Sequence, residues 1–459
     1  MRKRVDAHQV GWRLGQAAQP RAGGPLWVPY DRTAGVIGPQ GSGKSLDLLL
    51  PALLDAPGAA LATMTKPQDL LLTWTTRSRT GPCVVADPHG LAPGLPPLVW
   101  DPLAGCRDPW TAQRRAQAFT AGLTGARGGD SDAARFYAAE AAKVIAGFLH
   151  AAALAGHTLD QLLRWVAHPA GATEPVEILR TYSDAARHWH GLLSAALTGD
   201  DRTAANTATT VQQALGLFFQ PGLRERCTPR PDRPATDLAG LISRHGTVYL
   251  LGRDDPYAPA APLLTAIAED VLDTALRLAH QSAWGRLCPP LLACLDELPS
   301  TAPIPTLRTR MANERALGIA FIWAAQTWPQ LVSVLGDTEA RTLLGLTNVL
   351  VVFGGSNDTT FNHQLAQLTG HTRIARTNYS GARGSTTVHG EDIAVVTLDE
   401  VRRLPDRHAL VLADRARPIV AKLRRCVDGP AGHRLLQDQR HLTDQMRNNP
   451  TQPKASDDG

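Results

Sequence analysis

The sequence predicts an α/β fold with a mostly parallel sheet that is interrupted by an all-helical insertion. Short apolar runs alternate with helical segments in the first part of the chain, and apolar runs return from Thr247 onward. The stretch between them has helical periodicity and almost no strand pattern. Alternating strands and helices are typical of parallel sheets covered by helices on both faces. The 459 residues are enough for two or three domains.

The first part of the pattern covers residues 31–132, which we assign to the α/β domain. The apolar run Ala34–Ile37 leads into a glycine-rich loop, and Ser45–Leu54 has the pattern of a helix behind that loop. Three further short apolar runs are predicted strands: Ala59–Thr63, Val84–Ala86 and Leu98–Trp100.

The predicted insertion covers residues 133–234. Val144 and Phe148 can share one face of a helix, with the polar Glu140 and Lys143 on other faces. Prolines and glycines break the pattern before further helical segments, and a linker rich in proline and arginine closes the insertion. We therefore expect an all-α domain inserted into the α/β domain.

Strands return in residues 235–436, which complete the α/β domain. The predicted strands are Thr247–Leu251, Leu291–Leu295, Ile319–Ala324, Asn348–Phe353 and Ala409–Leu412. Residues 1–30 are polar and rich in turn-forming proline and glycine, so we expect an N-terminal extension. Residues 437–459 are polar and poor in aromatic side chains, so we expect a disordered tail.

Composition sets broad limits on function. The net charge of +5 and the pI of about 9.0 permit a nucleic-acid partner without requiring one. The six cysteines include no CxxC pair, so neither a disulfide framework nor a zinc site is predicted, and a reducing cytoplasm fits. Glu140 and Lys143 interrupt the longest apolar stretch, and no apolar run follows the basic start. The sequence therefore predicts neither a membrane span nor a secretory signal.

The motif G-x-x-x-x-G-K-[ST] occurs once in the chain. Its residues are Gly38, Pro39, Gln40, Gly41, Ser42, Gly43, Lys44 and Ser45. In such a loop the backbone N–H groups converge on phosphate oxygens at the positive end of a helix dipole. Lys44 would reach the β- and γ-phosphates of ATP, and the Ser45 hydroxyl would hold Mg²⁺. The strand before the loop and the helix after it favour a P-loop over a glycine-rich turn that matches by chance.

A P-loop enzyme also needs a carboxylate at the end of a neighbouring strand. The apolar run Leu291–Leu295 is followed by Asp296 and Glu297. Asp296 is expected to complete the Mg²⁺ shell through water, and Glu297 to orient or deprotonate the attacking water. A buried strand that ends in a solvated acidic pair is a common alternative. Together with the glycine loop, however, the acidic pair favours ATP hydrolysis.

Two further polar residues occur where a motor would use them. Gln326 follows an apolar strand, and its amide could sense the γ-phosphate or position water, although a loop glutamine fits the spacing equally well. Arg315 lies between the acidic pair and Gln326. It could stabilise transition-state charge from a neighbouring subunit, but spacing alone favours a surface salt bridge. Thr65-Lys66 ends another strand and its role stays open.

Together these motifs resemble the coupling-protein ATPases of conjugation and type IV secretion, the TraG/TraD type. The resemblance runs from about Val36 to Arg425. The loop GPQGSGKS and the acidic box CLDELP are generic. The specific part is the order and spacing of TMTKPQDLL, VVADPHG, NERALGIAFIWAAQT, NVLVVFGGSNDTTFNHQLAQLTG and LPDRHALVLADRARPIVAKL.

The resemblance implies a RecA-like P-loop NTPase with an inserted all-α domain, which binds ATP and Mg²⁺ and works as a homo-hexameric ring around DNA. Arg315 falls on the family's intersubunit arginine, so the resemblance favours the catalytic role that spacing alone does not. Five residues fall on the family's ATPase positions: Lys44, Ser45, Asp296, Glu297 and Gln326.

The implied function is a DNA-stimulated ATPase that delivers relaxase-bound DNA to a conjugative type IV secretion channel. Its partners would be DNA, the relaxase or relaxosome, and channel components. The family usually carries N-terminal transmembrane helices, whereas only 37 residues precede Gly38 here. We therefore expect a soluble, cytoplasmic form that a separate membrane-anchoring protein recruits to the inner face of the cell membrane. Two alternatives stay open: a nucleotide-regulated receptor for protein cargo without motor activity, and a DNA segregation or packaging ATPase.

Overall fold

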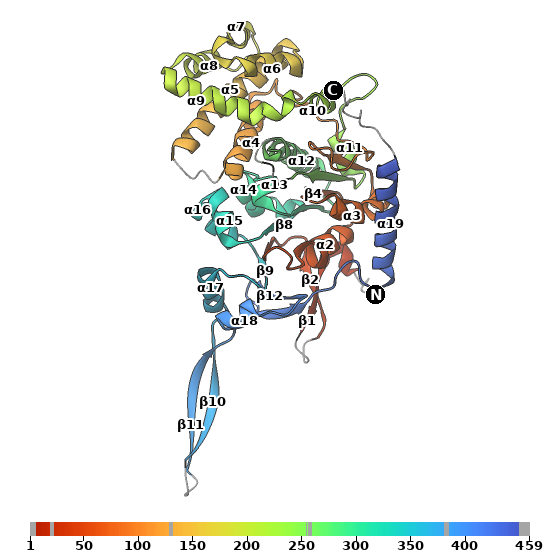
Figure 1. The fold of residues 1–459 in the computed structure, drawn as a ribbon, viewed down its shortest axis with the longest axis vertical. Coiled ribbons are helices and arrows are strands. Elements are labelled where there is room, and N and C mark those ends of the chain that lie inside the picture. Colours follow the sequence, from red (N-terminus) through yellow and green to blue (C-terminus); the bar gives the residue numbers. More distant parts are fainter. Residues whose placement is uncertain are drawn as a thin grey trace, which may run out of the picture.

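A computed structural model describes residues 6–18, 23–127, 132–253, 255, 259–380 and 385–448 of the chain. One large sheet contains eleven of the strands (Figure 1): β1 (Gly11–Ala17), β2 (Pro25–Pro29), β3 (Ala34–Ile37), β4 (Ala60–Met64), β5 (Cys83–Ala86), β6 (Thr247–Leu251), β7 (Leu291–Leu295), β8 (Ile319–Ala325), β9 (Val349–Phe353), β12 (His408–Ala413) and β13 (Ile419–Lys422).

The strands lie in the order β2-β1-β13-β12-β9-β3-β8-β7-β4-β6-β5. The seven strands from β9 to β5 run parallel, whereas β12, β13, β1 and β2 join one side in antiparallel pairs. Every residue of β3, β7 and β8 is buried, as parallel strands covered on both faces require. The predicted α/β fold with a mostly parallel sheet is confirmed. The predicted strand Leu98–Trp100 is wrong, because this segment touches β5 only through a bridge at Pro97.

Helices cover both faces of the sheet. Neighbouring residues of β3 point to opposite faces, so Ile37 packs in one core cluster and Val36 in another. The helices associated with the α/β part are α1 (Ala7–Val10), α2 (Leu50–Asp55), α3 (Pro67–Thr80), α11 (Leu238–Ser243), α12 (Ala261–Gln281), α13 (Leu298–Thr301), α14 (Leu307–Asn313), α15 (Trp328–Leu335), α16 (Asp337–Gly345), α17 (Thr359–Thr369), α18 (Leu398–Arg402) and α19 (Gly429–Asn448).

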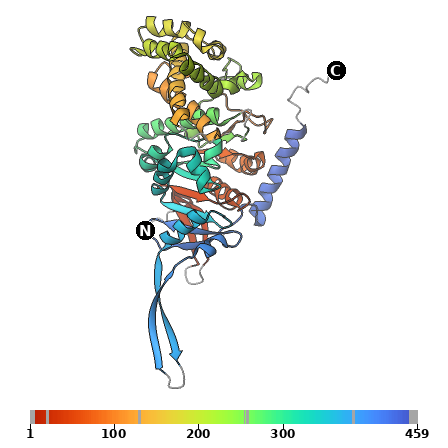
Figure 2. The same ribbon diagram turned by 60° about the vertical axis from the view of Figure 1, so that its left-hand side comes forward.

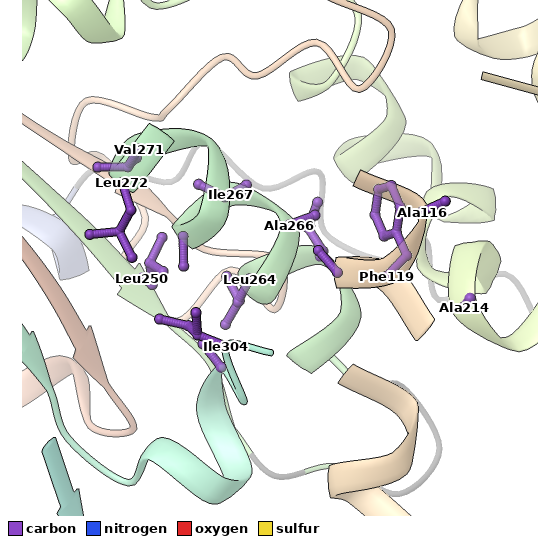
Figure 3. Packing of buried hydrophobic residues seen from close by; sticks show 14 of the residues in the cluster. Ala116, Phe119, Ala214, Leu250, Leu264, Ala266, Ile267, Val271, Leu272 and Ile304 are labelled. Carbon is purple, nitrogen blue, oxygen red and sulfur yellow. The ribbon is translucent and has the colours of Figure 1, made fainter. Parts of the chain in front are cut away.

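A group of helices stands at one end of the molecule (Figure 1). Its helices are α4 (Pro109–Arg127), α5 (Asp132–Ala155), α6 (Leu159–Ala167), α7 (Glu174–Thr181), α8 (Trp189–Thr198), α9 (Asp201–Leu215) and α10 (Pro221–Arg226). As far as the structure describes this stretch, it contains no named strand between Asp132 and Arg226. Figure 3 shows how the group joins the sheet: Leu272 of α12 lies beside Leu250 of β6, and Ala266 of α12 lies beside Phe119 of α4.

Helix α5 is the one described helix that is long and apolar enough to cross a membrane by length and composition. Most of its apolar window is buried inside the protein, where it packs against α4, α7, α8 and α9. Val144 and Phe148 are fully buried, in agreement with the helical face expected from their spacing. Helix α5 therefore has the surroundings of a core helix.

A long two-stranded ribbon projects from the end opposite the helical group (Figures 1 and 2). It consists of β10 (His371–Ser380) and β11 (Ser385–Ala394), paired antiparallel along their whole length. Arg373 and Arg376 lie on β10, and residues 381–384 between the two strands lie outside the described part of the chain.

The predicted N-terminal extension is wrong for β1 and β2, which belong to the main sheet. Strand β1 pairs with β2 on one side and with β13 on the other, and its own Trp12 and Leu14 are buried. Residues 1–5 and 19–22 lie outside the described residues. Glycine and proline suggested turns here, but Gly15 lies at a β-bulge, where glycine is common. Strand β2 begins and ends with proline and lies at the edge of the sheet, where proline is tolerated.

The predicted disordered tail is wrong for residues 437–448. These residues continue α19, which lies beside α3 and contacts it (Figure 1). Its few apolar side chains gather on one side and pack in the same cluster as α3: Leu435, Leu436, Leu442 and Met446. A narrow apolar stripe on a mostly polar helix escapes a test based on mean polarity. Residues 449–459 lie outside the described residues.

Candidate nucleotide-binding site

The predicted site residues meet at the carboxyl edge of the parallel strands. The loop at 38–45 follows β3, Gln326 follows β8, Asp296 follows β7, and Lys66 lies just after β4. These four strands are consecutive neighbours in the sheet, so the segments that follow them converge, as is usual for ligand sites in open α/β sheets. They line a cleft of about 660 Å³.

The glycine loop has a backbone that side chains would disturb. Gly41 and Gly43 have φ angles of +80° and +97°, in the left-handed region that glycine tolerates best. A Cβ atom at Gly43 would collide with the carboxylate of Asp47, one turn further along the chain. The loop ends in a π-helical turn at Ser45–Leu49, which continues into α2. The local geometry therefore explains why glycine is needed at Gly43.

Lys44 is almost completely buried and points back into its own loop. Its Nζ donates to the carbonyl oxygen of Gly38 at 2.6 Å and to that of Pro39 at 3.3 Å. The Glu297 Oε1 atom lies 3.8 Å from the same Nζ. Burial lowers the pKa of Lys44, while Glu297 and Asp296 act in the opposite direction. The ammonium group is thus held at the loop by bonds that an incoming phosphate could replace.

Ser45 and Asp296 form the contact expected of a magnesium site. The Ser45 hydroxyl donates to Asp296 Oδ2 at 2.8 Å, and Thr63 of β4 donates to the backbone carbonyl of Asp296 at 2.7 Å. Burial raises the pKa of Asp296, which a bound cation would reverse. Mg²⁺ commonly uses one or two carboxylates, substrate phosphates and water. One hydroxyl and one carboxylate beside the phosphate loop fit that pattern.

Glu297 has an unusual backbone and an unpaired carboxylate oxygen. Its φ and ψ of 49° and 46° lie in the left-handed region, which is strained for a residue with a side chain. Its Oε2 atom is buried and has no hydrogen-bond partner among the described residues. Burial, and then the charge of Asp296, raise the pKa of Glu297. The Gln326 and Gln330 side chains act on the pKa of this carboxylate in the opposite direction, and its Oε2 atom is placed to accept a proton from a bound water.

Gln326 lies in the cleft together with a residue that the sequence did not point to. Its backbone N–H donates to Oε1 of Gln330 at 3.1 Å, and Gln330 Nε2 donates to the Ser300 hydroxyl at 3.2 Å. Gln330 therefore links the ends of β8 and β7 beside Glu297. No motif marks Gln330, and only its position one turn into α15 brings it to the cleft.

Arg315 lies away from this cleft. It begins a short 3₁₀ turn at Arg315–Leu317 that precedes β8, whereas Gln326 follows the same strand, so roughly 20 Å of extended chain separates the two positions. Its Nη1 donates to Oδ1 of Asn348 at 2.8 Å. Arg315 therefore lies where β8 begins, whereas the P-loop lies at the edge of the sheet where the parallel strands end.

The turn that carries Arg315 is anchored by a buried ion network. Arg310 of α14 contacts Glu269 and Asp273 of α12, each at 2.6 Å, and Glu314 at 2.9 Å. Burial raises the pKa of Glu314 to about 7, although Arg310 acts in the opposite direction. Asp273 also contacts Arg114 of α4 at 3.2 Å, so the network reaches the helical group.

Among the charged residues of the cleft, the sequence left the role of Lys66 open and did not point to Asp69, Arg253 or Arg425. Lys66 and Asp69 come from the start of α3, Arg253 from the segment after β6, and Arg425 from the segment after β13. Burial and the charge of Asp296 raise the pKa of Asp69 to about 6. Lys66 and Asp69 follow the predicted strand at 59–63 closely. Because ligands of open α/β sheets bind beyond the carboxyl ends of the strands, this position could have predicted that both residues line the cleft. No local signal marks Arg425.

A second cavity, of about 700 Å³, lies between α4, α5 and α8. Its lining is mostly apolar and includes Leu192, Leu193 and Trp189. Neither the glycine loop nor the acidic pair lines it, so the nucleotide-binding motifs do not meet there. The cleft at the carboxyl edge is therefore the candidate site.

Comparison with known proteins finds a family model and solved structures that resemble this chain. Residues 290–406 match the family TraG-D_C, described as the TraM recognition site of TraD and TraG. No curated protein matches the chain in sequence. These residues include β7 with the acidic pair, Arg315, Gln326 and the ribbon β10–β11.

Solved structures with the same fold come from a coupling protein. The bacterial conjugative coupling protein TrwBdeltaN70, in its unbound form, shares 20% identity at a TM-score of 0.64, covering 89% of this chain and 88% of its own. TrwB in complex with ADP and Mg²⁺ shares 21% identity at a TM-score of 0.64, with 86% of each chain covered. TrwB with the non-hydrolysable ATP analogue ADPNP gives a TM-score of 0.63 at 21% identity and the same coverage.

The expected resemblance to the TraG/TraD coupling proteins is confirmed: residues 290–406 match the TraG-D_C family in sequence, and most of the chain has the RecA-like P-loop fold of the conjugative coupling protein TrwB.

Proposed function

We propose that this chain is a Mg²⁺-dependent ATPase that moves DNA toward a conjugative type IV secretion channel. The observation that carries the proposal is the convergence of Lys44, Ser45, Asp296 and Glu297 in one cleft at the carboxyl edge of the sheet. The TrwB complexes with ADP and Mg²⁺ and with ADPNP support it, because they have the same fold.

The residues of the cleft can be given distinct tasks. Mg²⁺, held by Ser45 and Asp296, would neutralise charge on the β- and γ-phosphates. The loop N–H groups bind the phosphates, and Lys44 exchanges its bonds to loop carbonyls for bonds to phosphate oxygens.

Hydrolysis then needs an activated water. Glu297 Oε2 accepts a proton from the water while the oxygen of that water bonds to the γ-phosphorus. The bond between the γ-phosphorus and the bridging oxygen breaks, and ADP leaves. Gln326, held by Gln330, orients the water or the γ-phosphate. Arg315 from a neighbouring subunit supplies positive charge to the same phosphate.

The DNA-translocation part of the proposal has a direct test. ATP hydrolysis by the purified chain is measured with and without single- and double-stranded DNA, and DNA affinity is measured from about 50 to about 200 mM salt. A motor that binds DNA through its phosphates should hydrolyse ATP faster when DNA is present. Its affinity for DNA should fall steeply with salt and depend little on base sequence. Absence of DNA binding at low salt, together with turnover that DNA leaves unchanged, refutes DNA translocation.

The same assay separates the motor from a nucleotide-regulated cargo receptor. A receptor binds ATP without appreciable turnover, and its nucleotide state changes affinity for a protein partner. Multiple turnovers that depend on Glu297 count against the receptor. A DNA segregation or packaging ATPase would share the DNA-stimulated hydrolysis and would differ in its partners.

The proposed partners are the relaxosome, with its relaxase, and components of the secretion channel. The match of residues 290–406 to a TraM recognition site supports a protein contact in this region. In this proposal the working assembly is a homo-hexamer at the inner face of the cell membrane, recruited by a membrane partner. Light scattering with ATP analogue and DNA tests the ring, and copurification with purified relaxosome and channel proteins tests the partners.

A further inference from the structure

One charged residue of the cleft comes from the far end of the chain. Arg425 lies between β13 and α19, and it lines the same cleft as Lys44 and Ser45. Its Nε donates to Oδ1 of Asp47 at 2.8 Å, and its Nη2 donates to Oδ2 at 3.4 Å. Asp47 is three positions after Lys44, so this ion pair joins the C-terminal segment to the back of the P-loop.

The two partners of this ion pair differ in their surroundings. The Asp47 side chain is 0% exposed, whereas the Arg425 side chain is 33% exposed. A buried carboxylate needs a charged or hydrogen-bonded partner, and the Asp47 carboxylate has one edge of the Arg425 guanidinium group as that partner. An arginine has five N–H donors in a planar fork, and the bonds to Asp47 use Nε and Nη2. Donors therefore remain for an anion in the cleft.

The guanidinium group lies against the phosphate loop itself. Arg425 Nη2 is 3.6 Å from the place that a Cβ atom would occupy at Gly43. The next residue, Cys426, donates its backbone N–H to the carbonyl oxygen of Leu46 at 2.9 Å, which fixes the segment beside the first turn after the loop. A phosphate bound by the loop N–H groups would therefore lie within the neighbourhood of the guanidinium.

We propose that Arg425 is a further nucleotide-binding residue, which contacts a phosphate of the bound nucleotide from the C-terminal segment. This inference rests on the proposed ATP-binding function and adds a residue outside the P-loop and acidic motifs. Arg425 keeps its bond to Asp47 and uses its remaining donors for the phosphate. The segment before α19 thus forms one wall of the nucleotide site.

The test measures the binding of ADP and ATP to the full-length chain by isothermal titration calorimetry. Arg425→Gln is expected to weaken both nucleotides by about tenfold or more, because a charge-assisted hydrogen bond to phosphate is lost. Arg425→Lys should recover part of that loss. Arg407→Gln is the matched control, because Arg407 forms an ion pair with Asp428 of the same segment at 2.8 Å but does not line the cleft. It should bind within about twofold of wild type.

Asp47→Asn separates ligand binding from a purely structural ion pair. It breaks the same pair but leaves Arg425 in place, so nucleotide affinity should stay within about twofold while the melting temperature falls. If Arg425→Gln and Asp47→Asn weaken nucleotide binding equally, the pair is structural and the inference is wrong. Unchanged nucleotide affinity in Arg425→Gln also overturns it. Melting curves show whether either variant has lost its fold. In that case the nucleotide affinity of Arg425→Lys is compared with that of Arg407→Gln, and equal affinities would contradict a phosphate contact of Arg425.

Lys44→Ala keeps this test distinct from the test of the proposed function. If the wild type does not bind ATP, or if Lys44→Ala binds as tightly as the wild type, the ATP-binding function itself fails. If Lys44→Ala loses binding while Arg425→Gln binds like the wild type, only the role of Arg425 fails.

Discussion

Arg315 and the P-loop strand share one anchoring side chain, Asn348. The Oδ1 atom of Asn348 accepts from Arg315 Nη1 at 2.8 Å and from the backbone N–H of Thr33 at 3.2 Å. Thr33 immediately precedes β3, the strand that leads into the P-loop. Arg315 is thereby tied to the strand that positions the phosphate loop of the same chain.

This location leads to a prediction for Arg315→Ala. If Arg315 completes the site of a neighbouring subunit, the variant should bind ATP like the wild type but hydrolyse it about 10³-fold more slowly. Mixing it with Lys44→Ala should restore part of the turnover, because an intact P-loop can then face an intact Arg315. Steady-state hydrolysis at a fixed total protein concentration measures this recovery. Mixtures that stay as inactive as the separate variants contradict a role across subunits.

Lys44 and Ser45 should separate nucleotide binding from magnesium dependence. Lys44→Ala removes the buried ammonium beside Gly38, so affinity for ATP should fall and hydrolysis should be lost. Ser45→Ala removes the hydroxyl that meets Asp296, so ATP binding should lose most of its dependence on Mg²⁺. Titration of ATP with and without Mg²⁺ makes the comparison. A Ser45→Ala chain with the same magnesium dependence as the wild type would show that the ion is held elsewhere.

Glu297→Gln should yield a chain that holds ATP without consuming it. The amide keeps the shape of the side chain but cannot accept the proton of the attacking water, so turnover should fall about 10²- to 10⁴-fold. The same change removes a buried carboxylate whose pKa is raised, so the free protein should be at least as stable as the wild type at neutral pH. Single-turnover hydrolysis and thermal melting are the two measurements. Rapid turnover by Glu297→Gln would exclude it as the general base.

Glu314 makes stability depend on pH in a way that Glu314→Gln should abolish. Its pKa is about 7 in the folded chain and near the ordinary 4.5 in the unfolded one, so the folded state holds the proton more tightly. The contribution of protonated Glu314 to the free energy of unfolding is therefore complete below about pH 4.5 and is lost as pH rises through about 7. Relative to the wild type, Glu314→Gln should gain about 1–3 kcal/mol of unfolding free energy between pH 5 and pH 8. Urea unfolding at both pH values measures it, and equal differences at the two pH values would contradict the raised pKa.

Much of the α/β architecture followed from local patterns in the sequence. The strands β6 and β7 begin and end where their apolar runs predicted, because fully buried parallel strands form nearly continuous apolar runs. The residues of the glycine loop and the acidic pair were also predicted, since each motif is contiguous. Both motifs line one cleft, in agreement with the expectation that a P-loop enzyme has a carboxylate at the end of a neighbouring strand.

What escaped prediction depends on contacts between distant parts of the chain. Arg425 reaches the P-loop across 378 positions, and nothing in its local sequence marks the meeting. Helix α19 is stabilised by a few apolar side chains against α3, so its average polarity suggested disorder. Strands β1 and β2 contain residues that disfavour strands, but pairing with β13 and with each other overrides that preference.

The place of β3 between β8 and β9 has a consequence for synthesis on the ribosome. The strand that leads into the phosphate loop is synthesised early, but both of its neighbours in the sheet are synthesised much later. Thr33 likewise bonds to Asn348, which follows it by 315 positions. The growing chain must therefore hold an apolar strand without partners until most of the protein has emerged. Non-local pairing of this kind slows folding and exposes the chain to aggregation. A ribosome that stops before β8 would release a polypeptide with the phosphate loop and the acidic pair but without either of the two strands that flank β3.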